Sequence, residues 1–188
     1  MKKRFTFLLF ASLLTLAGCG TNTANNTGTT AETKEETKQG SAITITDFAN
    51  RTVAFESAPK NIVTIGDGEV DIIYALGGEL VGRSTTHNEE VNKKLANIDQ
   101  VGNTHEFNLE KIASLKPDVV LANNPLNMKD IASIEGIGSE IILTNANSVK
   151  DIQKQITLFG ELIQKQDKAK QLVEEIDTNI AETSAKAT

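Results

Sequence analysis

The chain has 188 residues, and 39% of them are hydrophobic, which suffices for one ordinary domain with a sizeable core. It carries 19 Lys and Arg against 25 Asp and Glu, a formal net charge of −6. Because nucleic acids and anionic lipids attract positively charged proteins, this charge balance argues against both as direct electrostatic partners.

The first 18 residues have the organisation of a secretory signal peptide. Three cations at positions 2–4 are followed by an apolar run over 5–17, which is too short to cross a bilayer comfortably as a helix. The run ends in Leu-Ala-Gly-Cys, a sequence that resembles a bacterial lipobox, in which cleavage precedes the cysteine and the cysteine carries the lipid. We therefore expect lipidation of Cys19 and a lipid anchor on the extracytoplasmic face of the cell membrane.

The segment 19–41 starts with the only cysteine of the chain and continues with Thr, Asn, Gly and charged residues, almost without apolar side chains. Such a composition cannot bury a core and predicts a flexible tether. Removal of residues 1–18 takes away three cations and no acids, which leaves a net charge of 16 − 25 = −9. The folded part is expected to consist of a lobe over 42–166 and a long helix over 167–188.

The pattern beyond residue 42 predicts an α/β fold, with a mostly parallel sheet flanked by helices. Apolar and polar residues alternate over 42–55 on both sides of a polar turn, which predicts an N-terminal β-hairpin. After Pro59, short apolar runs alternate with helical segments, a pattern typical of a parallel sheet with helices on both faces. The expected strands are 61–65, 80–83, 98–101, 118–122 and 140–143, and the expected helices are 69–76, 88–96, 108–116, 148–163 and 167–188.

Three of the helix starts carry capping signals. Asn108 is a good N-cap, and Ser148 with Asp151 resembles a capping box. Asp167 is expected to cap the last helix. Helical spacing predicts that the last two helices bury two stripes, namely Val149, Ile152, Ile156, Phe159 and Ile163, and Leu172, Val173, Ile176 and Ile180.

Ligands of parallel sheets bind outside the carboxyl ends of the strands. The loops expected there are 66–68, 84–88, 102–107, 123–128 and 144–147, and they contain both histidines, His87 and His105. With Glu89, Glu90 and Glu106 nearby, the two histidines could ligate zinc or manganese, or they could be exposed loop residues without a ligand. Met128, in another of these loops, is either a packing residue or a soft axial ligand of a haem iron.

Several enzyme motifs are excluded by their chemistry. The stretch GDGEVD at 66–71 follows a strand, but it lacks the third glycine of a dinucleotide-binding loop, and its three acids would repel a pyrophosphate. His105 and Glu106 begin like a zinc-protease HExxH motif, but Leu109 replaces the second histidine. No Ser-His-Asp spacing or nucleophilic cysteine is present, so we expect no enzyme and no catalytic cofactor.

Two stretches, APKNIVTIGDGEVDIIYALGGELVGRS and VGNTHEFNLEKIASLKPDVVLANN, resemble the N-terminal lobe of the substrate-binding lipoproteins of iron-complex ABC importers. These proteins bind ferric siderophores, haem or cobalamin. Residues 148–177 resemble the helix pair whose second member joins the two lobes of such proteins. The chain departs from the family at 66–71, where the family usually has Ser-Pro-x-x-Thr-Glu, and the family's second lobe is missing, so we expect a fragment or a truncated gene.

The resemblance implies a role for several residues. Glu110 matches the glutamate that pairs with an arginine of the permease, and His105 stands where haem-binding members place an axial methionine. Since imidazole is a normal ligand of haem iron, His105 is the candidate metal ligand. The remaining candidate ligand-binding residues are Asp67, His87, Thr104, Phe107 and Met128, with Tyr74 as a further stacking contact.

The expected function is capture of an iron complex and its delivery to the permease and ATPase subunits of an importer, by a monomer. The cleft loops supply only Arg83 and Lys129 as cations, whereas catecholate complexes carry several negative charges, and this favours haem as the ligand. The alternatives are a ferric hydroxamate siderophore or cobalamin bound by the same fold, a zinc- or manganese-binding lipoprotein, and a non-functional truncated lobe.

Overall fold

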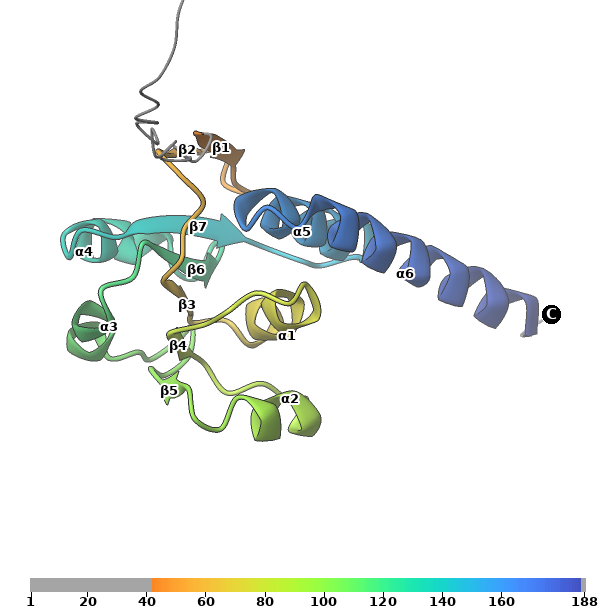
Figure 1. The fold of residues 1–188 in the computed structure, drawn as a ribbon, viewed down its shortest axis with the longest axis horizontal. Coiled ribbons are helices and arrows are strands. Elements are labelled where there is room, and N and C mark those ends of the chain that lie inside the picture. Colours follow the sequence, from red (N-terminus) through yellow and green to blue (C-terminus); the bar gives the residue numbers. More distant parts are fainter. Residues whose placement is uncertain (1–41, 187–188) are drawn as a thin grey trace, which may run out of the picture. The chain divides into compact units, whose positions relative to one another are not determined.

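A computed structural model of the chain describes residues 42–186 (Figure 1). The predicted hairpin is present as β1 (Ile43–Thr46) and β2 (Thr52–Phe55), which pair antiparallel. Five strands form a wholly parallel sheet in the order β5-β4-β3-β6-β7. They are β3 (Ile62–Thr64), β4 (Gly82–Arg83), β5 (Asp99–Gln100), β6 (Val119–Asn123) and β7 (Glu140–Thr144). The predicted α/β fold is therefore confirmed.

The helices divide between the two faces of this sheet (Figure 1). They are α1 (Asp67–Ala75), α2 (Glu89–Lys94), α3 (Leu109–Leu115), the 3₁₀ turn η1 (Met128–Asp130), α4 (Ile131–Glu135), α5 (Val149–Leu162) and α6 (Gln166–Lys186). Buried side chains of α1, α2, α5 and α6 share one apolar cluster with the hairpin, whereas those of α3 and α4 share the other. The chain first adds β4 and β5 on one side of β3 and then adds β6 and β7 on its other side. The strand order therefore changes direction beside β3.

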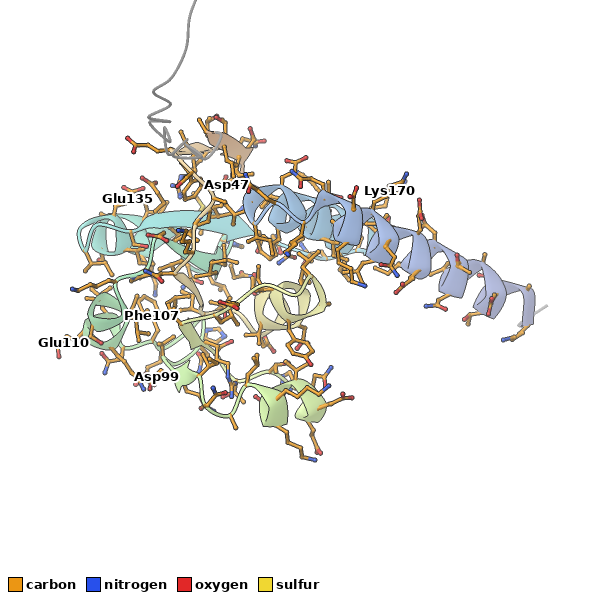
Figure 2. The ribbon with its side chains drawn as sticks, viewed as in Figure 1. Asp47, Asp99, Phe107, Glu110, Glu135 and Lys170 are labelled. Atoms are coloured by element: carbon orange, nitrogen blue, oxygen red, sulfur yellow. The ribbon has the colours of Figure 1, made fainter. Side chains whose placement is uncertain are left out.

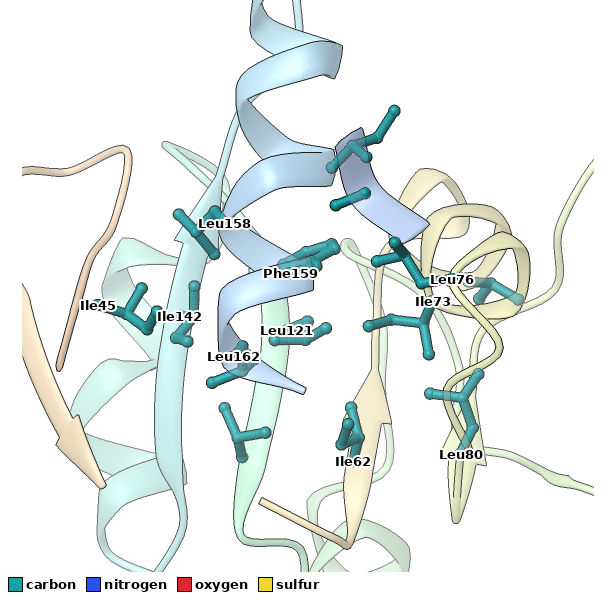
Figure 3. Packing of buried hydrophobic residues seen from close by; sticks show 14 of the residues in the cluster. Ile45, Ile62, Ile73, Leu76, Leu80, Leu121, Ile142, Leu158, Phe159 and Leu162 are labelled. Atoms are coloured by element: carbon teal, nitrogen blue, oxygen red, sulfur yellow. The ribbon is translucent and has the colours of Figure 1, made fainter. Parts of the chain in front are cut away.

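The larger cluster is built around α5, which lies across β6 and β7 (Figure 3). Phe159 and Leu162 of α5 are fully buried, and they pack in the same cluster as Leu121 and Ile142 of these strands. The sequences of β6 and β7 are nearly continuous apolar runs, because both faces of these strands are covered.

Helices α5 and α6 approach each other closely. A Cβ on Gly160 would lie 2.4 Å from the Cβ of Ala169, so this crossing requires a glycine on α5. Among the described residues of α6, only Ala169 is fully buried, and Ile180 is 43% exposed. The apolar stripe predicted for this helix is therefore covered at its start and exposed further along.

Three sequence predictions need correction. Val149 and Ile152 are exposed, because the first turns of α5 lie at the carboxyl edge of the sheet and burial begins only at Gln155. The last helix starts at Gln166, so Asp167 lies inside the first turn and does not precede it as a cap. The short helix α4 was not predicted, because five residues are too few to show a helical period.

The capping predictions for α3 and α5 are confirmed. The Asn108 side chain accepts a hydrogen bond from the backbone N–H of Lys111, at 2.8 Å. The Ser148 hydroxyl accepts from the backbone N–H of Asp151, and the Asp151 carboxylate accepts in return from the N–H of Asn147. This arrangement differs from a standard capping box, in which the returning bond goes to the N-cap residue itself.

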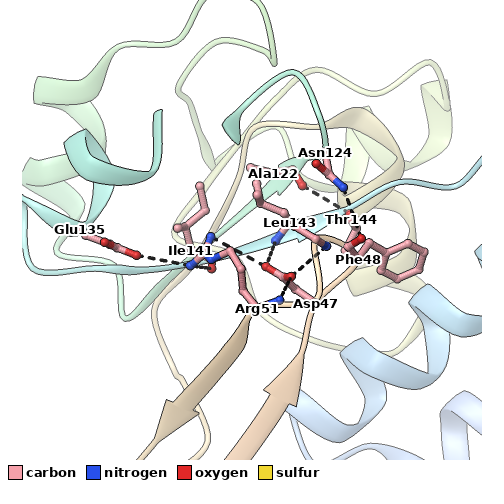
Figure 4. A network of polar contacts seen from close by, with 10 residues as sticks. Asp47, Phe48, Arg51, Ala122, Asn124, Glu135, Ile141, Leu143 and Thr144 are labelled. Atoms are coloured by element: carbon pink, nitrogen blue, oxygen red, sulfur yellow. Dashed lines mark hydrogen bonds and ion pairs between the residues drawn. The ribbon is translucent and has the colours of Figure 1, made fainter. Parts of the chain in front are cut away.

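Asp47, in the turn of the hairpin, joins the hairpin to the sheet (Figure 4). Its buried carboxylate accepts hydrogen bonds from the backbone N–H groups of Ala49 and Arg51 at 2.9 Å and from that of Leu143 at 3.3 Å. The first two bonds fix the turn, and the third fixes the turn to the end of β7. A backbone bond from Phe48 to the Leu143 carbonyl, at 2.9 Å, reinforces this attachment.

None of the helices described over 42–186 combines the length and the apolar content needed to cross a membrane. The predicted signal peptide, Cys19 and the tether lie outside the described residues.

The Asp47→Ala variant should lower the free energy of unfolding by about 3 kcal/mol, because three backbone donors lose a charged acceptor in a buried setting. Urea unfolding followed by circular dichroism measures the loss. Asp118→Ala is the matched control, since this exposed carboxylate also accepts two backbone hydrogen bonds, from Lys60 and Asn61. Equal losses in the two variants would contradict the role given to burial at Asp47.

Candidate functional site

A pocket of about 440 Å³ lies at the carboxyl ends of β3, β4 and β5. It brings together four of the residues that the sequence predicts as ligand contacts, from three separate loops. These four are Asp67, His87, Thr104 and His105. The rest of the lining consists of Ile65, Ser84, Thr85, Thr86, Gln100, Gly102 and Asn103. Apart from Ile65, the lining is polar or glycine, and it contains neither lysine nor arginine.

His87 and Asp67 form the only ion pair on the pocket wall within residues 42–186. The distance between Nε2 of His87 and Oδ2 of Asp67 is 3.3 Å, and the two side chains are 99% and 52% exposed. Since solvent screens such an exposed pair, it contributes little to stability. Both groups are free to turn toward a ligand.

The loop that carries His105 has a fixed backbone. Gly102 has a φ of 110°, and a Cβ at this position would lie 2.3 Å from the carbonyl oxygen of Glu106, so the tight turn requires glycine. The Asn103 side chain accepts hydrogen bonds from the N–H groups of His105 and Glu106, at 2.9 and 3.2 Å. These contacts fix the backbone of the turn, and the His105 side chain on it is exposed.

Asn127 holds this turn against the next loop, and sequence reasoning missed it. The side chain is fully buried, and its Nδ2 donates to the carbonyl of Thr104 at 2.9 Å. Its Oδ1 accepts from the N–H of Asn123, at 3.1 Å. An asparagine among the polar residues of 123–128 gives no local signal that it is buried, so only the tertiary contact identifies it.

Other predicted contacts lie away from the pocket. Phe107 is half-buried against the core cluster of α3 and α4, and with Glu110 it borders a separate hollow. Figure 2 labels both residues. Met128 is 49% exposed in η1 and does not line the pocket. Tyr74 lies in the last turn of α1, at the end of that helix remote from the carboxyl edge.

The expectation that Arg83 supplies a cation to the cleft needs correction. Its side chain is only 1% exposed. The guanidinium donates to the carbonyls of Leu95 and Ser84 at 3.0 Å and to Oδ1 of Asn92 at 2.9 Å. Arginine at the end of a two-residue strand turns inward because α2 and its C-cap residue offer two of these acceptors, and this contact was not visible in the sequence.

A buried carboxylic acid explains the unusual loop 66–71. Glu69 is 5% exposed, and its Oε1 accepts a hydrogen bond of 2.6 Å from the Thr144 hydroxyl, which accepts in turn from Gln155. A Cβ on Gly66 would lie 1.9 Å from the Glu69 carboxylate, so glycine at 66 and the inward glutamate at 69 go together. Burial raises the pKa of Glu69 above its ordinary value of 4.5, against the opposing effect of the Thr144 bond.

The two histidines face one pocket, but no metal cluster surrounds them. Over residues 42–186, no group of three or more His, Cys, Asp or Glu side chains is placed to hold a metal ion. For zinc or manganese, the structure brings together only two candidate ligands, His87 and Asp67, and these do not make a full ligand set.

The sequence from 62 to 188 matches the family described as periplasmic binding protein. The chain belongs to this family. The residues that match include all five strands of the parallel sheet and every loop that forms the pocket.

Individual members and structures resemble the chain over part of their length. An uncharacterized ABC transporter substrate-binding lipoprotein, YvrC of Bacillus subtilis (strain 168), is 34% identical over 100% of this chain and 60% of its own length. A vitamin B12-binding protein of Vibrio vulnificus (strain YJ016) is 34% identical over 58% of this chain and 41% of its own length. The siderophore-binding protein BauB, bound to a complex of two acinetobactin molecules and ferric iron, superposes with a TM-score of 0.67 and 25% identity, over 77% of this chain and 54% of BauB. The chain thus spans about half the length of the proteins that it resembles.

The Glu69→Gln variant should alter how stability depends on pH. Because burial raises the pKa of Glu69, the folded state keeps this proton at pH values where the unfolded state releases it, and the contribution of Glu69 to the free energy of unfolding falls as pH rises above 4.5. Glutamine carries no proton to lose, so the stability of the variant relative to the natural chain should increase with pH across this window. Urea unfolding at several pH values between 4 and 8 measures both curves. Glu140→Gln, an exposed carboxyl-to-amide change, controls for the substitution itself. Parallel curves for the natural chain and Glu69→Gln would contradict the prediction.

Proposed function

We propose that the chain forms the N-terminal lobe of a lipid-anchored, extracytoplasmic binding protein, which captures an iron complex and delivers it to the permease and ATPase subunits of an ABC importer. One observation carries this proposal. Residues from three loops that the sequence predicts as ligand contacts line one polar pocket at the carboxyl edge of the sheet, where ligands of such folds bind. Membership of the periplasmic binding protein family supports a binding function without catalysis.

The pocket is suited to a ligand that reaches beyond it. Its volume of about 440 Å³ lies at the lower end of the range of about 300–1,000 Å³ for small-molecule sites. A haem or a ferric siderophore would therefore place only one part against this lobe and the rest against a region like the part of the relatives that lies beyond the matched length. The lobe would fix orientation, and its rigid His105 turn would fix the metal centre.

Haem is the ligand that we propose, with His105 as an axial ligand of the iron. The imidazole is exposed at the rim of the pocket, on a backbone held by Asn103 and Asn127. Neutral imidazole binds haem iron readily, and a fixed turn reduces the conformational entropy lost on binding. The haem carboxylates would point away from Asp67 on the pocket wall, because its negative charge would repel them.

A ferric-haem titration followed in the Soret region tests the axial ligand. The purified chain should give a saturable shift, and His105→Ala should abolish it, because the iron loses its protein nitrogen. His87→Ala is the matched control, as it removes the other exposed histidine of the same pocket and should retain the shift. Indistinguishable titrations of the natural chain and His105→Ala would reject haem ligation by this residue.

A ferric hydroxamate siderophore or cobalamin is the second candidate, and the absence of lysine and arginine from the described pocket lining favours it. Without cations, the lining suits a ligand of low net charge. A hydroxamate complex leaves no open iron position, so its binding should survive His105→Ala. The same variant therefore separates the two candidates.

Glu110 is the residue that we propose for docking to the permease. It is exposed in the first turn of α3, and its side chain points away from the body of the lobe (Figure 2). Over residues 42–186 its side chain makes no hydrogen bond or ion pair, so its contribution to the fold is limited to the favourable position of an acid in the first turn of a helix.

Charge reversal at Glu110 should separate docking from folding. Glu110→Arg should reduce the stimulation of the importer's ATPase activity in proteoliposomes severalfold, because an arginine on the permease would then face a like charge. The midpoint of thermal unfolding should stay close to that of the natural chain. Glu140→Arg is the control, since Glu140 is exposed at the opposite edge of the sheet. Equal stimulation by Glu110→Arg and the natural chain would refute the docking role.

A further inference from the structure

Ser84 occupies an unusual position in the pocket. It directly follows β4, it is fully buried, and it belongs to the pocket lining. Its hydroxyl oxygen has no hydrogen-bond partner among the described residues. Buried polar side chains are normally paired, so an unpaired hydroxyl beside a pocket calls for an explanation.

The polar side chains around Ser84 are already engaged with the protein. The Thr86 hydroxyl donates to Asp71 at 2.7 Å and accepts from the N–H of Asn88 at 3.0 Å. The Thr85 hydroxyl donates to Gln100 at 3.3 Å. Ser84 therefore differs from Thr85 and Thr86 in having a hydroxyl that the fold leaves free, and rotation about χ1 lets that hydroxyl turn without moving the backbone.

Arg83 places a buried positive charge beside the backbone of Ser84. The buried guanidinium donates to the Ser84 carbonyl at 3.0 Å, and its other two acceptors, Leu95 and Asn92, are also uncharged. Among residues 42–186, no carboxylate lies within 4.0 Å of it as an ion-pair partner. A buried charge without a counter-ion keeps its field in the surrounding low-dielectric region, and this field favours an electron-rich atom near Ser84.

We propose that the Ser84 hydroxyl donates a hydrogen bond to an oxygen atom of the captured ligand, with Arg83 acting behind it as a positioning residue. This inference rests on the proposed function and names the chemistry at the inner end of the pocket. The acceptor is a carboxylate, hydroxamate or amide oxygen, groups that haem, hydroxamate siderophores and cobalamin respectively carry. Arg83 and Asn92 fix the segment: the guanidinium holds the Ser84 carbonyl, and the Asn92 side chain contacts the backbone of Thr86 on both its N–H and its carbonyl.

The proposal predicts opposite effects on stability and on binding. Without ligand, Ser84→Ala removes an unpaired buried hydroxyl, so the variant should unfold at the same temperature as the natural chain or at a higher one. With ligand, the same variant lacks a donor to an electron-rich oxygen, so its affinity should fall about tenfold. A hydroxyl with a purely structural role would give the reverse pattern, with lower stability and unchanged affinity.

The experiment uses the purified full chain with Ser84→Ala and two comparison variants. Thr85→Ala removes an exposed hydroxyl from the same pocket, and Thr86→Ala removes a hydroxyl with two protein partners. Thermal unfolding without ligand is measured for all four proteins. Isothermal titration with ferric haem, a ferric hydroxamate complex and cyanocobalamin then shows which oxygen-bearing ligand binds and how much each variant loses.

An unchanged or raised unfolding temperature together with about tenfold weaker binding for Ser84→Ala, beside a smaller loss for Thr85→Ala, supports the contact. Unchanged affinity of Ser84→Ala for a ligand that the natural chain binds overturns it. A fall in unfolding temperature similar to that of Thr86→Ala also overturns it, since the hydroxyl would then have a partner in the protein. Failure of the natural chain to bind any of the three probes contradicts the proposed function and, with it, the proposed Ser84 contact.

Discussion

Parallel pairing of β3 with β4 on one side and β6 on the other is the constraint on which the rest of the molecule depends. Because parallel strands point in one direction, every loop that leaves a carboxyl end emerges at the same edge of the sheet. Residues 65–67, 84–87 and 100–105 are distant in sequence, and they meet in one pocket only for this reason. The return crossings require helices, and these helices supply both cores that hold the strands in place.

Buried polar groups in this lobe fall into two kinds. Asp47 and Arg83 each have three neighbouring partners and hold a segment in place, the hairpin turn in one case and the loop after β4 in the other. Glu69 and Ser84 are less well satisfied: burial opposes ionisation of the first, and the hydroxyl of the second is unpaired. Both lie near the carboxyl edge, beside the candidate site. Buried polar groups that lack a full set of hydrogen-bond partners are expected at a binding site, because the ligand can supply the missing partner.

Sequence reasoning predicted those features whose physical cause is local. The caps at Asn108 and Ser148 depend on atoms three residues away, so the sequence contains all that is needed. Loop positions at the carboxyl edge follow from the alternation of strands and helices, and this placed His87 and His105 together before any contact was known. The inward turn of Arg83 and the burial of Asn127 depend on acceptors in distant segments, and no local pattern reports them.

Burial of Arg83 also changes how the pocket selects among ligands. An exposed arginine would attract any anion and would favour the ligand with the largest negative charge. A buried guanidinium acts over a short range, here on the carbonyl of Ser84, while Asp67 on the wall repels further negative charge. Under the proposed Ser84 contact, the pocket would suit one well-placed oxygen on a ligand of low net charge, and additional carboxylates would weaken binding unless they point away from Asp67. With the Ser84 contact that we propose, selection in this lobe would rest on the position of an acceptor atom and not on the total charge of the complex.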